Sequence, residues 1–412
     1  MALLIIILTQ GHCLQGRQIL IGTKGRRVFI VGGKRTPFGK FGGSLASITP
    51  VDLAAYAAKS LLIETKANPE DIDQVLFANV LPSTTDTFYG GRHLALKCGL
   101  KITTPGVVVN RLCGSGIQAL IDGARLIRHA EAEMILIGGA ENMSMAPHLV
   151  YGSRFGTKYG SLVTKDMLLD TLTDQYAQIP MGMTAENLAV EYMVTKEESD
   201  KYAYESHLKA NKAYKDGLIQ PEIITIKNEK IECSKDEHLR EEISLAEMQK
   251  LKPTFKKDGT VTAGSASGIV DGGAALLLAS EDYVKKNNLT AIAEIIDGAV
   301  VGVEPSKMGI GPVPAIKEIL ARQKKTVSEI DLFEINEAFA TQVIACKKSL
   351  EIRDDQLNIW GGAVALGHPL GATGLKITMT LARQLQHFKK DYGISSACIG
   401  GGQGIALLIK RL

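Results

Sequence analysis

The sequence has few of the residues that mark several protein classes. Its six cysteines form no Cys-X-X-Cys pair and no zinc-ligand spacing with histidine. So few cysteines in 412 residues exclude a disulfide framework and predict free thiols in a reducing compartment. The net charge is only +3 and no long basic run is present, which argues against a nucleic-acid partner. The apolar run Ala2–Leu8 is much shorter than the ~20 residues of a membrane span, so we expect no integral membrane protein.

Glycine, in contrast, is abundant. The chain contains 42 glycines but only 5% aromatic residues, with 45% hydrophobic and 22% charged residues. This composition is typical of a globular protein, and it favours an α/β fold with tight strand-to-helix turns over a β-sandwich. The length is sufficient for two or three domains.

Residues 1–27 differ in composition from the rest of the chain. They contain four basic residues, and no acidic residue occurs before Asp52. Because acid-poor, arginine-containing segments are typical of organellar transit peptides, we expect a mitochondrial presequence and a protein of the mitochondrial matrix. A wrongly assigned start codon is the alternative, since the globular pattern begins near Val28. A peroxisomal or cytoplasmic location is the other possibility, although the C-terminal Lys-Arg-Leu matches a peroxisomal signal only in its last two residues.

Short apolar strands alternate with helical patterns in residues 28–144, which predicts a mainly parallel sheet with helices on both faces. Residues 145–268 are richer in charge and methionine and predict an inserted cap or loop domain, with helices at 184–192 and 197–214 and a hairpin near 222–233. The α/β pattern returns afterwards. We therefore expect residues 269–290 to complete the first half and residues 291–412 to form a second half.

The second half repeats the layout of the first. Asn79 and Asn336 each follow a strand, and small-residue tetrads that begin at Cys113 and Gly371 come 34 and 35 residues later. Each tetrad begins a helix, and each helix leads to a strand that ends in glycines. This repetition predicts an internal duplication, in which the two matching helix starts lie close together.

Cys113 lies in Asn-Arg-Leu-Cys-Gly-Ser-Gly, between a buried strand and a helix. Unpaired N–H groups and the helix dipole stabilise a thiolate, so we expect a lowered pKa for Cys113. A buried structural thiol is the competing interpretation, and it is the more common one for a lone cysteine.

Three further residues lie at equivalent strand or helix ends. His368 precedes the second tetrad and could be the base that an activated thiol needs. Cys398 precedes a run of glycines, and Asn336 could orient a water or donate to an oxyanion. Taken singly, each has a structural alternative: a turn histidine, a buried thiol or a strand-end amide.

Together these motifs resemble those of the thiolase family. The resemblance extends from about Val28 to the C-terminus, and it is closest to the mitochondrial branch that acts on 3-ketoacyl-CoA. The matching segments are 110–116, 138–147, 264–268, 336–340, 367–374 and 398–404.

This resemblance implies the thiolase fold: two duplicated βαβαβαββ halves that form a layered α-β-α-β-α core, with an inserted loop domain at 145–268 that binds coenzyme A (CoA). It implies a homodimer or homotetramer. It also implies an acyltransferase of fatty-acid β-oxidation, which cleaves 3-ketoacyl-CoA into acetyl-CoA and a shortened acyl-CoA. CoA would be a substrate and product, and neither a metal nor a prosthetic group is expected.

The resemblance also implies residue roles. Cys113 matches the nucleophile that carries the acyl group, His368 its base, and Cys398 the acid/base at the α-carbon of acetyl-CoA. Asn336 matches the residue that holds a water in an oxyanion hole with His368, and the backbone N–H groups of Cys113 and Gly400 match a second hole. Three residues are expected to bind CoA: Ser267 at the pantetheine, Arg240 at the nucleotide end, and Ser244.

Two positions depart from the family pattern. Ser265 stands where asparagine is usual, and Glu241-Glu242 follows Arg240, where acidic side chains would repel a phosphate.

An acetoacetyl-CoA thiolase and a non-catalytic thiolase-like subunit are the alternatives to a 3-ketoacyl-CoA thiolase. A condensing enzyme of the ketoacyl synthase type would have two histidines and no counterpart of the Cys398 segment.

Overall fold

The computed structural model describes residues 25–412, except residues 228 and 230. The presequence expected at 1–27 therefore falls almost wholly outside the described residues. Within the described part, no helix combines the length and apolar character that crossing a membrane requires. The cysteines of this part, Cys98, Cys113, Cys233, Cys346 and Cys398, are free thiols, as expected.

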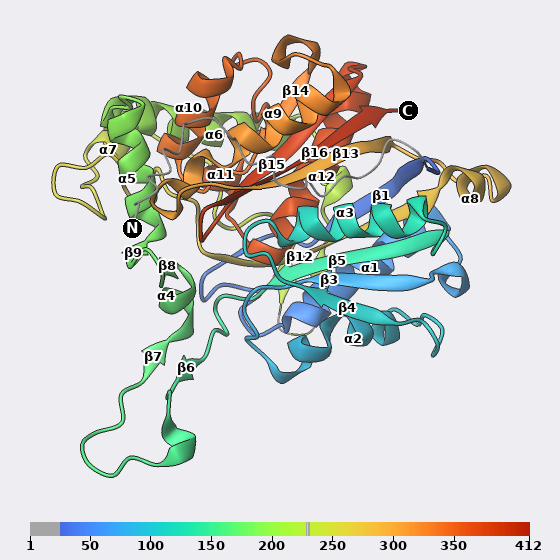
Figure 1. Cartoon of the computed structure of the whole chain (residues 1–412), viewed down its shortest axis with the longest axis horizontal. Helices are drawn as coiled ribbons and strands as arrows, with labels where there is room; N and C mark the ends of the chain where they lie inside the picture. The colour runs from blue at the N-terminus through green and yellow to red at the C-terminus, as the bar shows by residue number, and fades with distance from the viewer. Residues whose placement is uncertain (1–24, 228, 230) are drawn as a thin grey trace, which may run out of the picture.

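Two half-sheets form the centre of the molecule (Figure 1). They join where Val28–Ile30 of the first strand pair antiparallel with Ala293–Ile295, which gives one ten-stranded ladder. The first half-sheet contains, in spatial order, β1 (Val28–Arg35), β12 (Val270–Ser280), β5 (Met134–Glu141), β3 (Gln74–Ala78) and β4 (Gly106–Val109), with β2 (Gly39–Lys40) paired to β12. The second contains β13 (Ala293–Gly302), β16 (Gln403–Arg411), β15 (Tyr392–Ile399) and β14 (Leu332–Ile335).

The expectation of a mainly parallel sheet is wrong, because the sheet is mixed. Parallel pairing is confined to β3–β4, β3–β5 and β14–β15 within the described residues. The long strands β12 and β16 pair antiparallel with their neighbours. The physical reason is connectivity: β16 follows β15 through a tight glycine turn, and β12 follows the insertion, so neither arrives through the crossover helix that parallel pairing needs.

Helices occupy three layers around the two half-sheets. A central hydrophobic core joins α3 and α12 to both half-sheets, while separate cores join α1 and α2 to the first and α9 and α10 to the second. The layered α-β-α-β-α core of the thiolase fold is therefore confirmed. These helices are α1 (Pro50–Thr65), α2 (Gly90–Lys97), α3 (Ser115–Arg128), α9 (Pro312–Gln323), α10 (Ala340–Leu350) and α12 (Leu370–Phe388); α8 (Glu281–Lys286) and α11 (Ala363–Leu366) are short.

The two central helices cross at glycines near their N-termini. A Cβ on Gly374 would lie 2.4 Å from the backbone nitrogen of Ile117, and a Cβ on Gly116 would lie 2.8 Å from that of Leu375. Only glycine permits this approach of the two backbones. The matching helix starts therefore lie together, as the internal repeat predicts.

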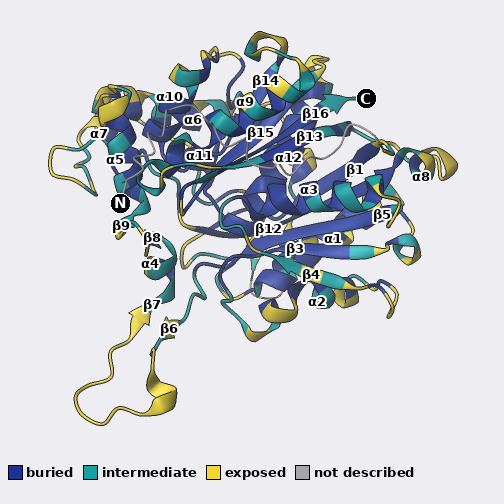
Figure 2. Cartoon of the chain, viewed as in Figure 1, coloured by how far each residue is buried: buried dark blue, intermediate teal, exposed yellow. Residues whose placement is uncertain are grey.

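The segment between β5 and β12 contains helices and three short hairpins. Its predicted helices correspond to α5 and α6, and its predicted hairpin to β10–β11. One hairpin, β6–β7, protrudes as an arm whose connection is exposed (Figures 1 and 2). In this connection, Phe155 is 91% exposed and Tyr159 is 99% exposed. The elements are β6 (His148–Leu149), β7 (Lys165–Asp166), α4 (Met167–Thr171), β8 (Thr173–Asp174), β9 (Ile179–Pro180), α5 (Met181–Glu191), α6 (Lys196–Lys215), β10 (Ile226–Lys227), β11 (Glu232–Cys233) and α7 (Leu245–Gln249).

Candidate active site

Cys113 lies at a tight corner between β4 and α3. The preceding residue, Leu112, has a left-handed φ of 47°, which is unfavourable for a residue with a Cβ. Ser115 holds the corner, because its N–H and its hydroxyl both donate to the carbonyl oxygen of Leu112, at 2.9 and 2.7 Å. The Ser115 hydroxyl also accepts the N–H of Arg111, at 2.8 Å. The thiol is therefore fixed just before the helix begins.

The pKa of Cys113 is raised to about 11, mainly because the thiol is buried. The N–H groups of Gly400 and of Cys113 itself favour the thiolate and oppose this shift. The expectation of a lowered pKa is therefore wrong. Its physical basis fails because desolvation outweighs the local N–H groups, and because α3 begins only at Ser115, beyond Cys113.

His368 is buried beside α12, and its neutral form has a defined tautomer. Its Nδ1 lies 2.6 Å from the hydroxyl oxygen of Thr373, and that hydroxyl donates its only proton to the carbonyl oxygen of Pro369 at 2.9 Å. With that proton directed to Pro369, Nδ1 is the donor to Thr373 and the lone pair is on Nε2, which is the tautomer that a base at this nitrogen requires. Burial lowers the pKa of His368 to about 4, so the imidazole is a neutral base at physiological pH.

Asn336 contacts this basic nitrogen. Its Nδ2 lies 3.3 Å from Nε2 of His368, and its backbone N–H donates to the carbonyl oxygen of Ser396 at 2.8 Å. The amide can therefore donate toward Nε2 or toward a group bound beside it. Its Oδ1 is buried and has no hydrogen-bond partner among the described residues.

Cys398 and Gly400 come from the end of β15. In the hairpin to β16, Cys398 pairs with Gly404, and the intervening Gly401 and Gly402 both have a φ of 81°, which favours glycine. This turn directs the N–H of Gly400 to the thiol of Cys113. Burial, followed by the charge of a Cys113 thiolate, raises the pKa of Cys398 well above its ordinary value. The two thiols are thus electrostatically coupled.

A cavity of about 70 Å³ brings these groups together. It is lined by Cys113, His368, Ser267 and Gly400, and otherwise mainly by apolar side chains. Asn336 contacts the cavity through His368, whereas Cys398 does not line it and belongs to the buried apolar cluster that contains Phe339. A wider apolar passage of about 320 Å³ shares several of these residues, Ser267 and His368 among them.

Comparison with known proteins identifies the family. The profile of the thiolase N-terminal domain matches residues 28–282, and that of the C-terminal domain matches residues 289–411. The chain belongs to the thiolase family.

Relatives and solved structures agree with this membership. The mitochondrial 3-ketoacyl-CoA thiolase of Homo sapiens is 48% identical, over 93% of this chain and 98% of the relative. A probable acetyl-CoA acyltransferase of Staphylococcus aureus is 43% identical, over 93% of this chain and 99% of the relative. The human enzyme in complex with CoA superposes with a TM-score of 0.92, covering 94% of this chain and 98% of that chain. A Bacillus anthracis acetyl-CoA acetyltransferase, 39% identical, also gives 0.92, over 95% and 100%.

The residues expected to bind CoA in this thiolase lie in two places. Ser267 lines the cavity at Cys113, whereas Arg240 and Ser244 line a surface pocket of about 510 Å³. Two histidines lie between these places. The ring of His238 packs against Gly268, so closely that a Cβ on this glycine would lie 2.6 Å from the ring. The ring of His207 follows, with its centroid 6.4 Å from that of His238. The N–H of Arg240 donates to Nδ1 of His207 at 3.4 Å.

Both departures from the family pattern have a local structural setting. The hydroxyl of Ser265 accepts the N–H of Thr262 at 2.9 Å and is fully buried, so it stabilises the turn that precedes Ser267. Glu241 is paired with Lys235, which offsets its charge near Arg240. Ser244 begins α7 but makes no side-chain cap, so its hydroxyl remains free to bind a ligand.

Sequence analysis missed Glu337, which supports the loop of Asn336. Its carboxylate is buried and accepts four hydrogen bonds, of 2.8–3.0 Å, from Tyr202, Ser206, Asn358 and the N–H of Val364. The sequence signal was an acidic residue directly after Asn336.

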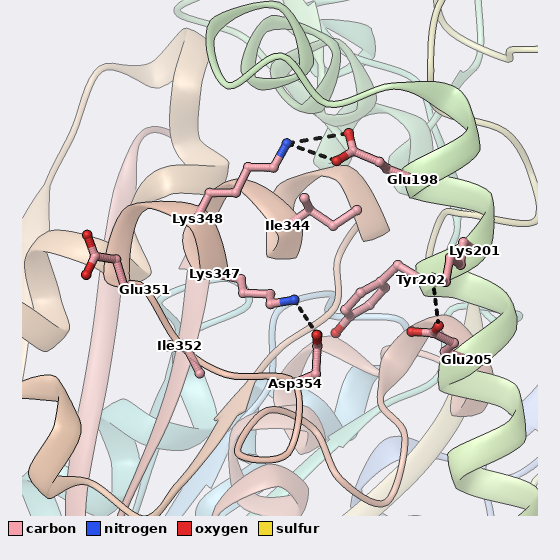
Figure 3. A pocket seen from close by; sticks show the side chains of 10 residues that line it. All are labelled: Glu198, Lys201, Tyr202, Glu205, Ile344, Lys347, Lys348, Glu351, Ile352 and Asp354. Carbon is pink, nitrogen blue, oxygen red and sulfur yellow. Dashed lines mark hydrogen bonds and ion pairs between the residues drawn. The ribbon is translucent and has the colours of Figure 1, made fainter.

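Tyr202 also lines a separate surface pocket of about 410 Å³ between α6 and α10. In this pocket Lys347 pairs with Asp354, and Lys348 pairs with Glu198 (Figure 3).

Proposed function

We propose that this thiolase is a 3-ketoacyl-CoA thiolase, an acyl-CoA:acetyl-CoA C-acyltransferase of fatty-acid β-oxidation. The observation that carries the proposal is the cavity where the thiol of Cys113, the imidazole of His368 and the N–H of Gly400 lie together. The names of the human and bacterial relatives support it. CoA serves as substrate and product, and the CoA-bound human structure supports this role.

In the first half-reaction, the sulfur of Cys113 attacks the 3-keto carbon while its proton passes to Nε2 of His368. Because the thiol and imidazole are both neutral at rest, this transfer accompanies the attack. The N–H groups of Cys113 and Gly400 stabilise the charge that develops on the keto oxygen. The C2–C3 bond then breaks, and its electron pair leaves as the enolate of acetyl-CoA.

Cys398 completes this half-reaction by donating its proton to C2 of the enolate. Asn336, through a water held with His368, stabilises the enolate oxygen. In the second half-reaction, the thiol of a new CoA gives its proton to the Cys398 thiolate and attacks the thioester carbon. Cys113 leaves as the thiolate and takes back its proton from His368, and the shortened acyl-CoA is released.

Thiolysis measured across acyl chain lengths tests the proposal. The apolar passage beside His368 supports turnover of medium-chain 3-ketoacyl-CoA as well as acetoacetyl-CoA. Turnover of acetoacetyl-CoA alone would instead identify an acetoacetyl-CoA thiolase, an alternative that the bacterial acetyl-CoA acetyltransferase structure favours. A Cys113→Ala protein that kept full thiolysis would overturn both assignments.

We further propose the division of the chain into 28–144, completed by 269–290, an inserted CoA-binding domain at 145–268, and a second half at 291–412. The mitochondrial relatives support a location in the mitochondrial matrix.

The protruding arm with exposed Phe155 and Tyr159 supports a homodimer or homotetramer, because an isolated chain would leave these aromatic residues in water. Light scattering during size-exclusion chromatography would measure the assembly.

A further inference from the structure

A second, much smaller cavity lies next to Asn336, within the protein. Its volume is about 10 Å³, close to the minimum that holds one water molecule. Asn336, Thr373 and Lys376 contribute its polar side chains. These three residues are 1%, 2% and 4% exposed, so the cavity is internal.

The amide of Asn336 has one satisfied end and one unsatisfied end. Its Nδ2 faces the lone pair on Nε2 of His368, at 3.3 Å. Rotating the amide by 180° would place Oδ1 against that lone pair, so the observed orientation is the favourable one. Oδ1 is nevertheless buried without a partner in the described part of the chain, although buried polar groups are almost always hydrogen-bonded.

Lys376 is the donor with spare capacity at this cavity. The hydroxyl of Thr373 already donates to Pro369, and the N–H groups of Gly362 and Gly367 donate to Ser206 and Ala363. Among the described residues, the Lys376 ammonium forms no hydrogen bond and no ion pair. The carboxylate of Glu334 is near enough for Lys376 to lower its pKa, which burial raises to about 7.

We propose that one buried water in this cavity bridges the ammonium of Lys376 and Oδ1 of Asn336. Lys376 is then a positioning residue that acts through Asn336. The bridge holds the amide with Nδ2 toward His368, and the positive charge polarises the amide, which makes Nδ2 a stronger donor to negative charge in the site.

The kinetic consequence of the bridge rests on the proposed function. If Asn336 stabilises the enolate oxygen, loss of the bridge weakens a contact that matters more in the transition state than in substrate binding. The effect is therefore expected in kcat rather than in KM.

Three variants test this role in thiolysis. Lys376→Met keeps the length of the side chain but removes its donors, Lys376→Arg keeps charge and donors, and Lys317→Met removes an exposed lysine as the matched control. We expect Lys376→Met to lower kcat about tenfold with KM within twofold of the wild type, and Lys376→Arg to restore most of it. Added to Asn336→Ala, Lys376→Met should cause little further loss, because both changes remove the same contact.

A folded Lys376→Met protein with wild-type kcat, or an undiminished extra loss in the Asn336→Ala background, would overturn the proposal. A high-resolution crystal structure of the wild-type protein provides a test that needs neither a folded variant nor activity. It should show one water within hydrogen-bond distance of both Oδ1 of Asn336 and the Lys376 ammonium. An empty cavity there would refute the bridge even if thiolysis were established, whereas a bridging water in a protein without thiolysis would refute only the proposed function.

Discussion

The carboxylate of Glu141 accepts a hydrogen bond of 3.0 Å from the backbone N–H of Gly371. Glu141 ends β5 in the first half-sheet, and Gly371 lies in the first turn of α12, beside the loop of His368. The same carboxylate accepts the N–H of Leu81 and the Nδ2 of Asn79, both at 2.9 Å. One buried side chain therefore ties the loop after β3 to the helix that follows His368.

Glu141→Gln should destabilise the fold. Glutamine has one acceptor oxygen, and its amide group would face N–H donors that the carboxylate now accepts. We expect the free energy of unfolding to fall by about 2–3 kcal/mol, with lower kcat as the His368 loop loosens. Urea denaturation and thiolysis measure the two effects. Glu70→Gln, which changes an exposed glutamate, is the control, and equal urea midpoints for the two variants would contradict this role.

Replacing Cys398 should separate the two chemical tasks of the site. In Cys398→Ala, Cys113 and His368 remain, so the protein should still form the acyl-enzyme with acetyl-CoA. Exchange of the acetyl protons with D2O, and with it thiolysis, should fall at least 100-fold, because the proposed acid/base at C2 is removed. Mass spectrometry follows acylation and NMR follows deuterium incorporation.

Cys346→Ala is the matched control for this separation. Cys346 is also buried, but its sulfur donates to the carbonyl oxygen of Gly309, whereas the thiol of Cys398 is coupled to that of Cys113. Both acylation and proton exchange should persist in this variant. Proton exchange at the wild-type rate in Cys398→Ala would assign the proton to another group.

The crossing of α3 and α12 predicts a steric effect on stability. In Gly374→Ala, the new methyl group would lie 2.4 Å from the backbone nitrogen of Ile117, and the two helices would have to separate. We expect a loss of about 2–3 kcal/mol in unfolding free energy, measured by urea denaturation. Gly302→Ala, where the nearest atom is 4.0 Å from the new Cβ, should cost less. Comparable losses in the two variants would contradict tight packing at the crossing.

The alternation of strands and helices and the neighbourhood of Cys113, His368 and Asn336 could be predicted because they follow local rules, whereas the layered core was predicted from the family resemblance. Each residue lies where a strand or a small-residue tetrad ends, and the internal repeat brings equivalent ends together. The direction of the strands could not be predicted from these rules, because β12 and β16 enter the sheet without crossover helices. Family resemblance supplied the roles of these residues, which no local pattern contains.

Other features could not be predicted because they depend on contacts between distant segments. Glu141 and Glu337 each collect donors from several loops, and a sequence does not reveal which donors will surround a carboxylate. The pKa of Cys113 was misjudged for a related reason. A helix start is visible in the sequence, but the burial that outweighs it comes from the opposite half and the insertion.

His368 should make stability depend on pH. Burial lowers its pKa to about 4 in the folded protein, against an ordinary value of 6.5. Below pH 6.5 the unfolded chain binds a proton that the folded protein does not, so stability falls as the pH drops from 6.5 to 4. The loss attributable to this group is at most about 3 kcal/mol. In His368→Gln this contribution should vanish, and the unfolding free energy should depend less on pH across this window. Urea denaturation at fixed protein concentration measures the slope, with His129→Gln, which removes an exposed imidazole, as the control. If His368→Gln kept the wild-type slope, His368 would not be the buried neutral base that the proposed chemistry requires.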